Sequence, residues 1–321
     1  MVNPFRLEEV YPDAPVGPAR LPRRQTGNSP QGLTVTLVAD YTLLRRAWLP
    51  AQASVELLTE FGISPAAART TINRLVRRGV LESSRRGRQA FYRLTEPAAA
   101  ELAAGGQTIV AFSQEAESWD GRWTLIAFSL PQEGDSQRRA LRGRLRWLGY
   151  APLYGALWIS PHTLPEGAAS TLAELSLGTL TVFRAEQLEV ARVTTRDPLE
   201  AWDVESIAEQ YQEFVGEWEP MLRRVRSGSI RGAQAVQART AVMDTYRGFV
   251  VLDPWVPMRM MPRGWLRDRA RDVFVDVYDG LAEPALGHVH EVLARYDENP
   301  QPDLRTHSVA DLLAGIRGAH S

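Results

Sequence analysis

The sequence contains no cysteine among its 321 residues. This absence excludes disulfides, thiolate zinc sites, iron–sulfur clusters and cysteine nucleophiles, and it is typical of a reducing compartment. Long apolar runs are lacking too, since no stretch approaches the roughly 18 residues that a transmembrane helix needs. The N-terminus does not show the charged region followed by an apolar run that marks a signal peptide. We therefore expect a cytoplasmic protein with no membrane partner.

Lysine is also absent, so that all 37 basic residues are arginines. A high-GC genome explains this bias most simply, and arginine content alone says little about phosphate binding. The distribution of charge says more. Residues 20–95 carry thirteen arginines against four acidic residues, a net charge of +9, whereas residues 96–321 carry twenty-three against thirty-one, a net charge of −8. A basic module on an acidic body predicts a polyanionic partner for the first part only.

The length of the chain predicts two or three domains. Residues 1–32 are rich in proline and poor in apolar periodicity, so we expect a flexible arm there. We assign residues 33–100 to a DNA-binding domain and residues 119–195 to a central domain that dimerises. Residues 196–321 are expected to form a mainly helical domain for effector sensing and dimerisation. The predicted fold class is α+β.

Residues 33–95 carry the succession of elements that is typical of a winged helix-turn-helix. Two helical patterns precede Ser64-Pro65, which combines a preferred N-cap with a preferred first helical residue. Ala68, Ile72, Leu75 and Val76 then recur at helical spacing and predict an apolar stripe on one face. The opposite face is small near its start and bears donors that can reach base edges and phosphates in a major groove. The DNA contacts predicted on this helix are Ser64, Ala66, Arg69, Thr70, Asn73 and Arg74.

A basic hairpin follows this helix. Residues 80–83 and 89–94 have the pattern of two strands, and Gly87 permits the positive φ of a tight turn. The tip carries Arg85, Arg86 and Arg88, which we expect to contact backbone phosphate or a minor groove, as a wing does. Two other interpretations remain open. The arginine face could be merely solvated, or the winged helix could bind protein instead of DNA.

The central block, from Trp123 to Arg184, shows the order β-α-β-β-α-β of a ferredoxin-like domain. Nucleases with this fold need acidic metal ligands at the end of the first strand, where this chain has Phe128-Ser129-Leu130-Pro131. We find no catalytic trio, phosphate loop or dinucleotide motif either. His288 and His290 are two residues apart and face different ways on a helix, which argues against a metal pair. We expect no enzyme activity, no cofactor and no metal.

The C-terminal block is mainly helical and is interrupted by a proline-rich stretch at residues 253–262. Its aromatic and methionine side chains, Trp255 and Trp265 among them, could line an apolar pocket, and Arg247, Arg259 and Arg263 could bind an anion. Such clusters are more often simply core. Asp253, which precedes Pro254, is interpreted as a turn residue.

Motifs in all three blocks resemble PaaX-type transcriptional regulators, over roughly residues 33–290. They are Phe61-Gly62-Ile63-Ser64, Ala68-Arg69-Thr70, Phe91-Tyr92-Arg93-Leu94-Thr95, Trp119-Asp120-Gly121, Arg146-Trp147-Leu148-Gly149, Arg239, Tyr246-Arg247, Asp253-Pro254 and Trp265. The resemblance implies a homodimeric repressor of aromatic catabolism genes, typically those for phenylacetate. It also implies binding to imperfect palindromes of double-stranded operator DNA and release by an aryl-CoA thioester such as phenylacetyl-CoA.

With the motif residues included, the candidate effector site comprises Arg239, Tyr246, Arg247, Trp255, Arg263 and Trp265. Three alternatives stay open. The protein could be a DNA-binding adaptor or architectural protein without a ligand, a PaaX-like regulator of a different pathway, or a nucleic-acid enzyme built on the ferredoxin-like unit.

Overall fold

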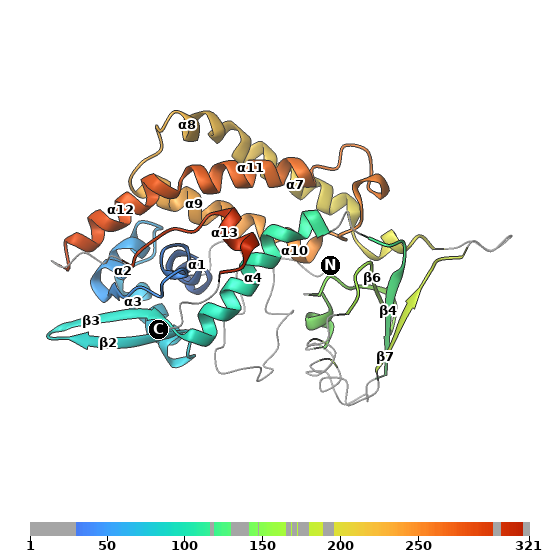
Figure 1. The fold of residues 1–321 in the computed structure, drawn as a ribbon, viewed down its shortest axis with the longest axis horizontal. Coiled ribbons are helices and arrows are strands. Elements are labelled where there is room, and N and C mark those ends of the chain that lie inside the picture. Colours follow the sequence, from blue (N-terminus) through green and yellow to red (C-terminus); the bar gives the residue numbers. More distant parts are fainter. Residues whose placement is uncertain are drawn as a thin grey trace. The chain divides into compact units, whose positions relative to one another are not determined.

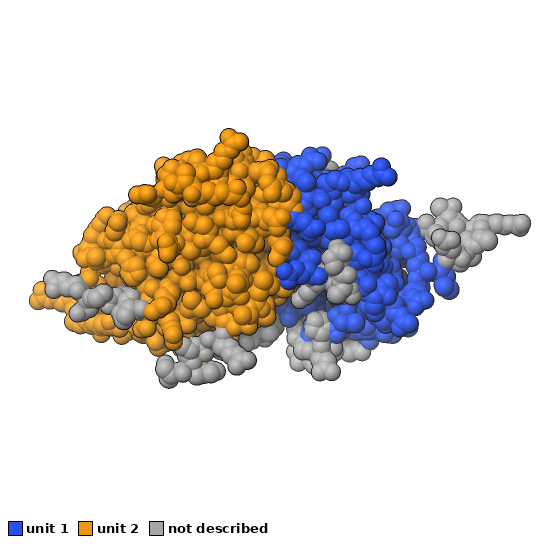
Figure 2. Space-filling view, turned by 45° about the horizontal axis from the view of Figure 1, so that its top comes forward, with its two compact units in different colours: residues 1–14, 112–213, 248–268 blue, residues 15–111, 214–247, 269–321 orange. Residues whose placement is uncertain are grey.

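The computed structural model describes residues 30–115, 119–129, 141–146, 148–164, 168, 172, 180–188, 196–297 and 303–316. The expected α+β class is confirmed, because the chain contains helices and two small antiparallel sheets (Figure 1). Figure 2 shows two compact units. We call residues 112–213 and 248–268 the central unit, and residues 30–111, 214–247 and 269–316 the N–C unit. The expected domain of residues 196–321 is thus divided between the two units.

The N-terminal part of the N–C unit holds helices and a three-stranded sheet. Its elements are α1 (Pro30–Thr42), β1 (Leu49–Pro50), α2 (Ala51–Thr59), α3 (Pro65–Arg77), β2 (Leu81–Arg86), β3 (Gln89–Leu94) and the start of α4 (Glu96–Glu115). The strand order is β1-β3-β2, antiparallel throughout. Helix α1 begins within the range expected to be a flexible arm, because proline is tolerated in a first helical turn. The rest of that arm lies outside the described residues.

The C-terminal helices pack against α1 and α2. The elements after residue 196 are η3 (Pro198–Ala201), α7 (Val204–Trp218), η4 (Glu219–Met221), α8 (Leu222–Arg226), α9 (Ala233–Tyr246), α10 (Phe249–Leu252), η5 (Met258–Met260), α11 (Arg267–Gly280), α12 (Ala282–Ala294) and α13 (Val309–Ala314). Helix α9 packs against α1 and α12, and α12 packs against α2 (Figure 1). Polar residues of α1 such as Thr36 and Asp40 are therefore buried as well as its apolar ones.

A buried polar cluster joins α1 to the C-terminal part of the chain. The hydroxyl of Tyr278 donates to Asp40 Oδ1 at 2.6 Å and lies 2.9 Å from His307 Nε2. Arg239 is fully buried, donates to the backbone carbonyls of Tyr278 and His307, and stacks 3.6 Å from the centre of the Tyr278 ring. Burial raises the pKa of Asp40 to about 6 and lowers the pKa of His307 to about 3. The cluster fixes α1 directly to α9 and α11.

The central unit contains a four-stranded sheet. Its strands are β4 (Trp123–Phe128), β5 (Ala151–Tyr154), β6 (Leu157–Ser160) and β7 (Leu180–Ala185). They are antiparallel in the order β5-β6-β4-β7, which is the order of a ferredoxin-like βαββαβ chain. Residues 141–146 are helical between β4 and β5, as expected, and their Leu141 and Leu145 pack with Trp158 in the core. The second expected helix lies largely outside the described residues.

Asp253 is the centre of a second buried polar cluster, in the central unit. Arg267 donates to both its carboxylate oxygens, at 2.9 and 2.5 Å, and neither side chain is exposed. Tyr211 and Trp265 donate to the same carboxylate through their hydroxyl and indole groups. The backbone N–H of Trp255 also donates to it at 2.8 Å, which makes the turn expected from the sequence. The sequence did not reveal the ion pair.

We predict that Asp253→Ala lowers the free energy of unfolding by about 3–5 kcal/mol, because it leaves the Arg267 charge buried without its partner. Asp276→Ala is the matched control. It removes an ion pair with Arg226 in which both side chains are exposed, and should cost at most about 1 kcal/mol. Urea unfolding followed by tryptophan fluorescence measures both. Equal, small losses for the two variants would contradict the assignment of Asp253 as a structural centre.

Candidate nucleic-acid interface

Helix α3 has one buried and one exposed face, and its start is fixed by a cap. The side chain of Ser64 accepts a hydrogen bond from the backbone N–H of Ala67 at 3.3 Å, and Pro65 is the first helical residue. Ala68, Ile72 and Leu75 are at most 2% exposed and lie on the side that packs against α1 and α2. The predicted cap is therefore confirmed. The predicted apolar stripe is confirmed as well, except that its last member, Val76, is only half-buried.

The opposite face of α3 is open to solvent. All six residues predicted to contact DNA on this helix are exposed: Ser64, Ala66, Arg69, Thr70, Asn73 and Arg74. Arg77 is exposed as well and lies one helical step beyond Arg74. Extending the helical spacing by one turn would have identified it from the sequence. The helix thus presents small side chains near its start and hydrogen-bond donors along its length.

The hairpin of β2 and β3 extends beyond the rest of its sheet and is basic at its tip. Arg86 pairs with Gln89 across the last rung, and Gly87 and Arg88 form the turn. Gly87 has a φ of +61°, which is the positive value that the first position of a tight hairpin turn requires. Arg85, Arg86 and Arg88 are all exposed.

The charged side chains at the base of the hairpin form ion pairs with one another. Glu82 accepts hydrogen bonds from Arg46 at 2.7 Å and from Arg93 at 2.6 Å. Arg93 also stacks 4.4 Å from the centre of the Trp48 ring. In the part of the chain that the structure describes, we find no ion pair to the three tip arginines. The positive charge of the hairpin is therefore concentrated at its end, and the structural role of Arg46 and Trp48 was not foreseen.

Three of the six candidate effector residues lie in the N–C unit and are engaged in its packing. Arg239 belongs to the buried cluster with Tyr278 described above. Tyr246 is buried and stacks on Phe274, with ring centres 4.1 Å apart. Arg247 forms an ion pair with Asp244 and donates to Thr36 of α1 at 3.0 Å. Burial lowers the pKa of Arg247 to about 9. These side chains tie α9 to neighbouring helices.

The other three candidate effector residues lie in the central unit. Trp255 has a φ of +55°, an uncommon value for a bulky residue, and its indole donates to the Val250 carbonyl at 2.9 Å. Its ring lies 4.9 Å from that of His162 and 5.7 Å from that of Phe112. Trp265 is buried beside Asp253, whereas Arg263 is exposed. Strained backbone of this kind often occurs at ligand sites.

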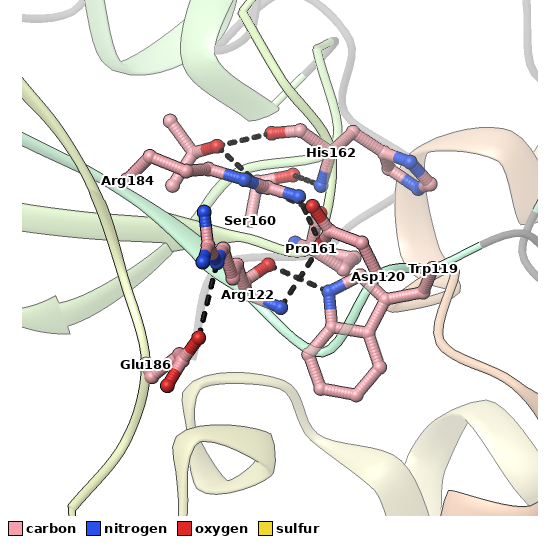
Figure 3. A network of polar contacts seen from close by, with 9 residues as sticks. Trp119, Asp120, Arg122, Ser160, Pro161, His162, Arg184 and Glu186 are labelled. Atoms are coloured by element: carbon pink, nitrogen blue, oxygen red, sulfur yellow. Dashed lines mark hydrogen bonds and ion pairs between the residues drawn. The ribbon is translucent and has the colours of Figure 1, made fainter.

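A polar network at one end of the central sheet includes the motif Trp119-Asp120-Gly121 (Figure 3). Arg184 of β7 donates to Asp120 Oδ1 at 2.5 Å, to Thr124 Oγ1 at 2.8 Å and to the Pro161 carbonyl at 2.9 Å. The motif residues thus link the start of β4 to β7 and to the end of β6. These contacts give the motif Trp119-Asp120-Gly121 a structural role, which is to hold the strands of the central sheet together at this end.

Comparison with known proteins gives matches to three family models. The model described as "PaaX-like protein" matches residues 29–98, "PaaX protein central Cas2-like domain" matches residues 116–197, and "PaaX-like protein C-terminal domain" matches residues 202–291. The chain belongs to the PaaX family. The resemblance found in the sequence is thereby confirmed.

Two individual proteins are also similar to this PaaX-family chain. It is 26% identical over 250 residues to "Transcriptional repressor PaaX" of Escherichia coli K12, which covers 76% of this chain and 77% of the relative. It also resembles the solved structure of the uncharacterized protein Rv0674 from Mycobacterium tuberculosis. That match has a TM-score of 0.52 and 19% identity, and covers 80% of this chain and 96% of the other. At this identity the second match shows a shared fold. None of the helices in the described part of this PaaX-family chain is long and apolar enough to cross a membrane.

The surroundings of His162 predict a pH dependence of stability. Burial, followed by the charge of Arg184, lowers the pKa of His162 to about 4, below its ordinary value of 6.5. As the pH falls, the imidazole of His162 takes up a proton in the unfolded chain before it does so in the folded protein. The contribution of His162 to the free energy of unfolding is therefore fully present above pH 6.5 and is lost as the pH falls towards 4. The contribution of one such group is at most about 1.4 kcal/mol per pH unit.

His162→Phe should flatten this dependence while it keeps a ring against Trp255. The free energy of unfolding, measured by urea titration at several pH values between 7 and 4.5, gives the slope. His290→Phe, on the exposed side of α12, is the control for replacing a histidine. An unchanged slope in His162→Phe would show that another group carries the pH dependence.

Proposed function

We propose that this protein is a sequence-specific, DNA-binding transcription repressor that acts as a homodimer in the cytoplasm. Helix α3 serves as the recognition helix of a winged helix-turn-helix, and the β2–β3 hairpin serves as its wing. One observation carries the proposal: every predicted contact on α3 and all three arginines at the hairpin tip are exposed on one basic module. Membership of the PaaX family and the name of the E. coli relative support it.

The chemistry of the exposed face suits a major groove. Ser64 and Ala66 are small, so the start of α3 can approach base edges closely, and Arg69 and Asn73 carry the groups that hydrogen-bond guanine and adenine. The wing arginines supply charge for phosphates or a minor groove, which gives affinity without sequence information. A homodimer places two α3 helices in successive major grooves. Its half-sites are then about 34–36 Å apart, or a multiple of that spacing.

Effector control is the second element of the proposal. The family resemblance implies an aryl-CoA thioester, such as phenylacetyl-CoA, as the inducer of a repressor of aromatic catabolism. Two features support an effector site in residues 253–265. Trp255 has a positive φ and aromatic neighbours that suit an aryl group, and Arg263, in the same unit, is exposed and suits an anion. An inducer releases DNA only if it binds the state with low DNA affinity more tightly.

Thermal unfolding in the presence of a panel of CoA thioesters tests this element. A thioester that acts as inducer should raise the unfolding temperature and lower operator affinity, and Trp255→Ala should weaken both effects. If none of the thioesters stabilises the protein, the adaptor or architectural alternative gains support, whereas a different stabilising ligand would indicate another pathway.

We predict that substitutions on the two DNA-contacting elements have different effects. Arg69→Ala and Asn73→Ala should relax sequence preference, with a loss of about 1–3 kcal/mol on the operator and little change on unrelated DNA. Arg86→Ala should weaken binding to all DNA about equally and reduce the salt slope by about 1. Fluorescence anisotropy with operator and scrambled duplexes at several salt concentrations measures these quantities.

Arg224→Ala serves as the control, because Arg224 is an exposed arginine on α8 and its loss removes the same charge. Its operator affinity should stay close to that of the wild type. The placement of α3 and the wing is wrong if Arg69→Ala, Asn73→Ala and Arg86→Ala all bind the operator as the wild type does.

A further inference from the structure

The two residues that follow α12, Arg295 at its C-cap and Tyr296, contact both α2 and the tip of the basic hairpin. The side-chain amide of Gln89 donates to the backbone carbonyl of Tyr296 at 2.8 Å. The hydroxyl of Tyr296 donates to Glu56 Oε2 at 2.6 Å, and Arg295 forms an ion pair with the same carboxylate. Figure 1 shows α12 beside α2, with its end directed towards the hairpin tip. Both Arg295 and Tyr296 lie beyond residue 291, where the family match ends.

Helix α2 is held by the C-terminal helices at a second point. His288 Nε2 of α12 lies 2.7 Å from Glu60 Oε1, and both side chains are largely buried. Gln237 of α9 donates to the backbone carbonyl of Glu60. Because α2 is bound to these C-terminal residues at both Glu56 and Glu60, Tyr296 is held in a fixed position. Its backbone carbonyl can therefore restrain the hairpin through Gln89.

The hairpin tip needs such support because it is only two strands wide. Strand β1 pairs with β3 only at Phe91 and Tyr92, so the rungs from Ala90 to the turn have no third strand. Isolated two-stranded hairpins are marginally stable in water. Gln89, which bonds to Tyr296, lies on the last rung, next to Arg88 and opposite Arg86. This bond therefore restrains the part of the hairpin that carries the arginines.

We infer that Tyr296, held in place by Glu56, is a positioning residue for the wing. It fixes the hairpin tip through Gln89 and so sets where Arg86 and Arg88 lie relative to α3. The inference rests on the proposed function, since a wing position matters only if the wing contacts DNA. It assigns the end of α12 a direct part in DNA affinity, and gives the C-terminal helices a route to the wing that does not pass through α3.

A double-mutant cycle tests the inference in the full-length protein. Tyr296→Phe removes only the hydroxyl that donates to Glu56, and operator binding is measured with and without the pair Arg86→Ala and Arg88→Ala. We expect Tyr296→Phe to weaken operator binding about fivefold, the equivalent of one hydrogen bond of about 1 kcal/mol. In the background without the two arginines the same substitution should change binding less than twofold, because no wing contact is left to misplace.

A second arm approaches the contact from the hairpin. Gln89→Ala should also weaken binding about fivefold, and its combination with Tyr296→Phe should lose little more than either single variant, since both break one chain of contacts. Tyr154→Phe, at an exposed tyrosine of the central unit, is the matched control and should bind as the wild type does. Thermal unfolding verifies that every variant is folded.

Each outcome of the cycle decides the matter. An equal loss from Tyr296→Phe in both backgrounds, or no loss in either, overturns the inference and leaves the proposed DNA binding intact. If the protein without Arg86 and Arg88 binds DNA as tightly as the wild type, the wing makes no contact, and the wing part of the proposed function fails together with the inference.

Discussion

The packing of α3 against α1 and α2 is the constraint on which the candidate interface depends. Ala68, Ile72 and Leu75 leave almost no surface exposed, so rotation of the helix about its axis would move apolar side chains into water. Burying one large apolar side chain contributes about 1.5–3 kcal/mol, and two of these three are large. The face with Arg69 and Asn73 is consequently held outward by the packing of the opposite face.

The same module is not an independent domain on a linker. Helix α1 lies between α3 and α9, and its Asp40 shares a buried cluster with Tyr278 and Arg239. Buried polar groups are costly unless they are paired, so such a cluster favours one arrangement of these helices over others. A change at α9, α11 or α12 therefore has a physical path through packed side chains to α3, the proposed recognition helix.

Several residues of the motifs that resemble PaaX-type regulators hold the fold together. Arg239 donates to two backbone carbonyls, Asp253 accepts from four different residues, and Asp120 receives Arg184 at the end of the central sheet. These contacts explain why arginine and aspartate occur at positions far from the basic module. Residues 253–265 include Asp253, Trp255 and Trp265 of one of these clusters, which would give the proposed effector site a rigid frame.

The sequence by itself determined the local elements of this protein. The cap at Ser64, the stripe through Leu75, the turn at Gly87 and the succession of elements along the central block all follow from short-range spacing and turn chemistry, which act within a few residues. The tertiary structure alone decided which parts share a core. The contacts of Glu56 with Tyr296 and of Asp40 with Tyr278 join residues more than 200 positions apart, and no local pattern records which distant surface will cover a helix. The division of the C-terminal region between two units and the support of the hairpin by α12 are therefore consequences of long-range packing.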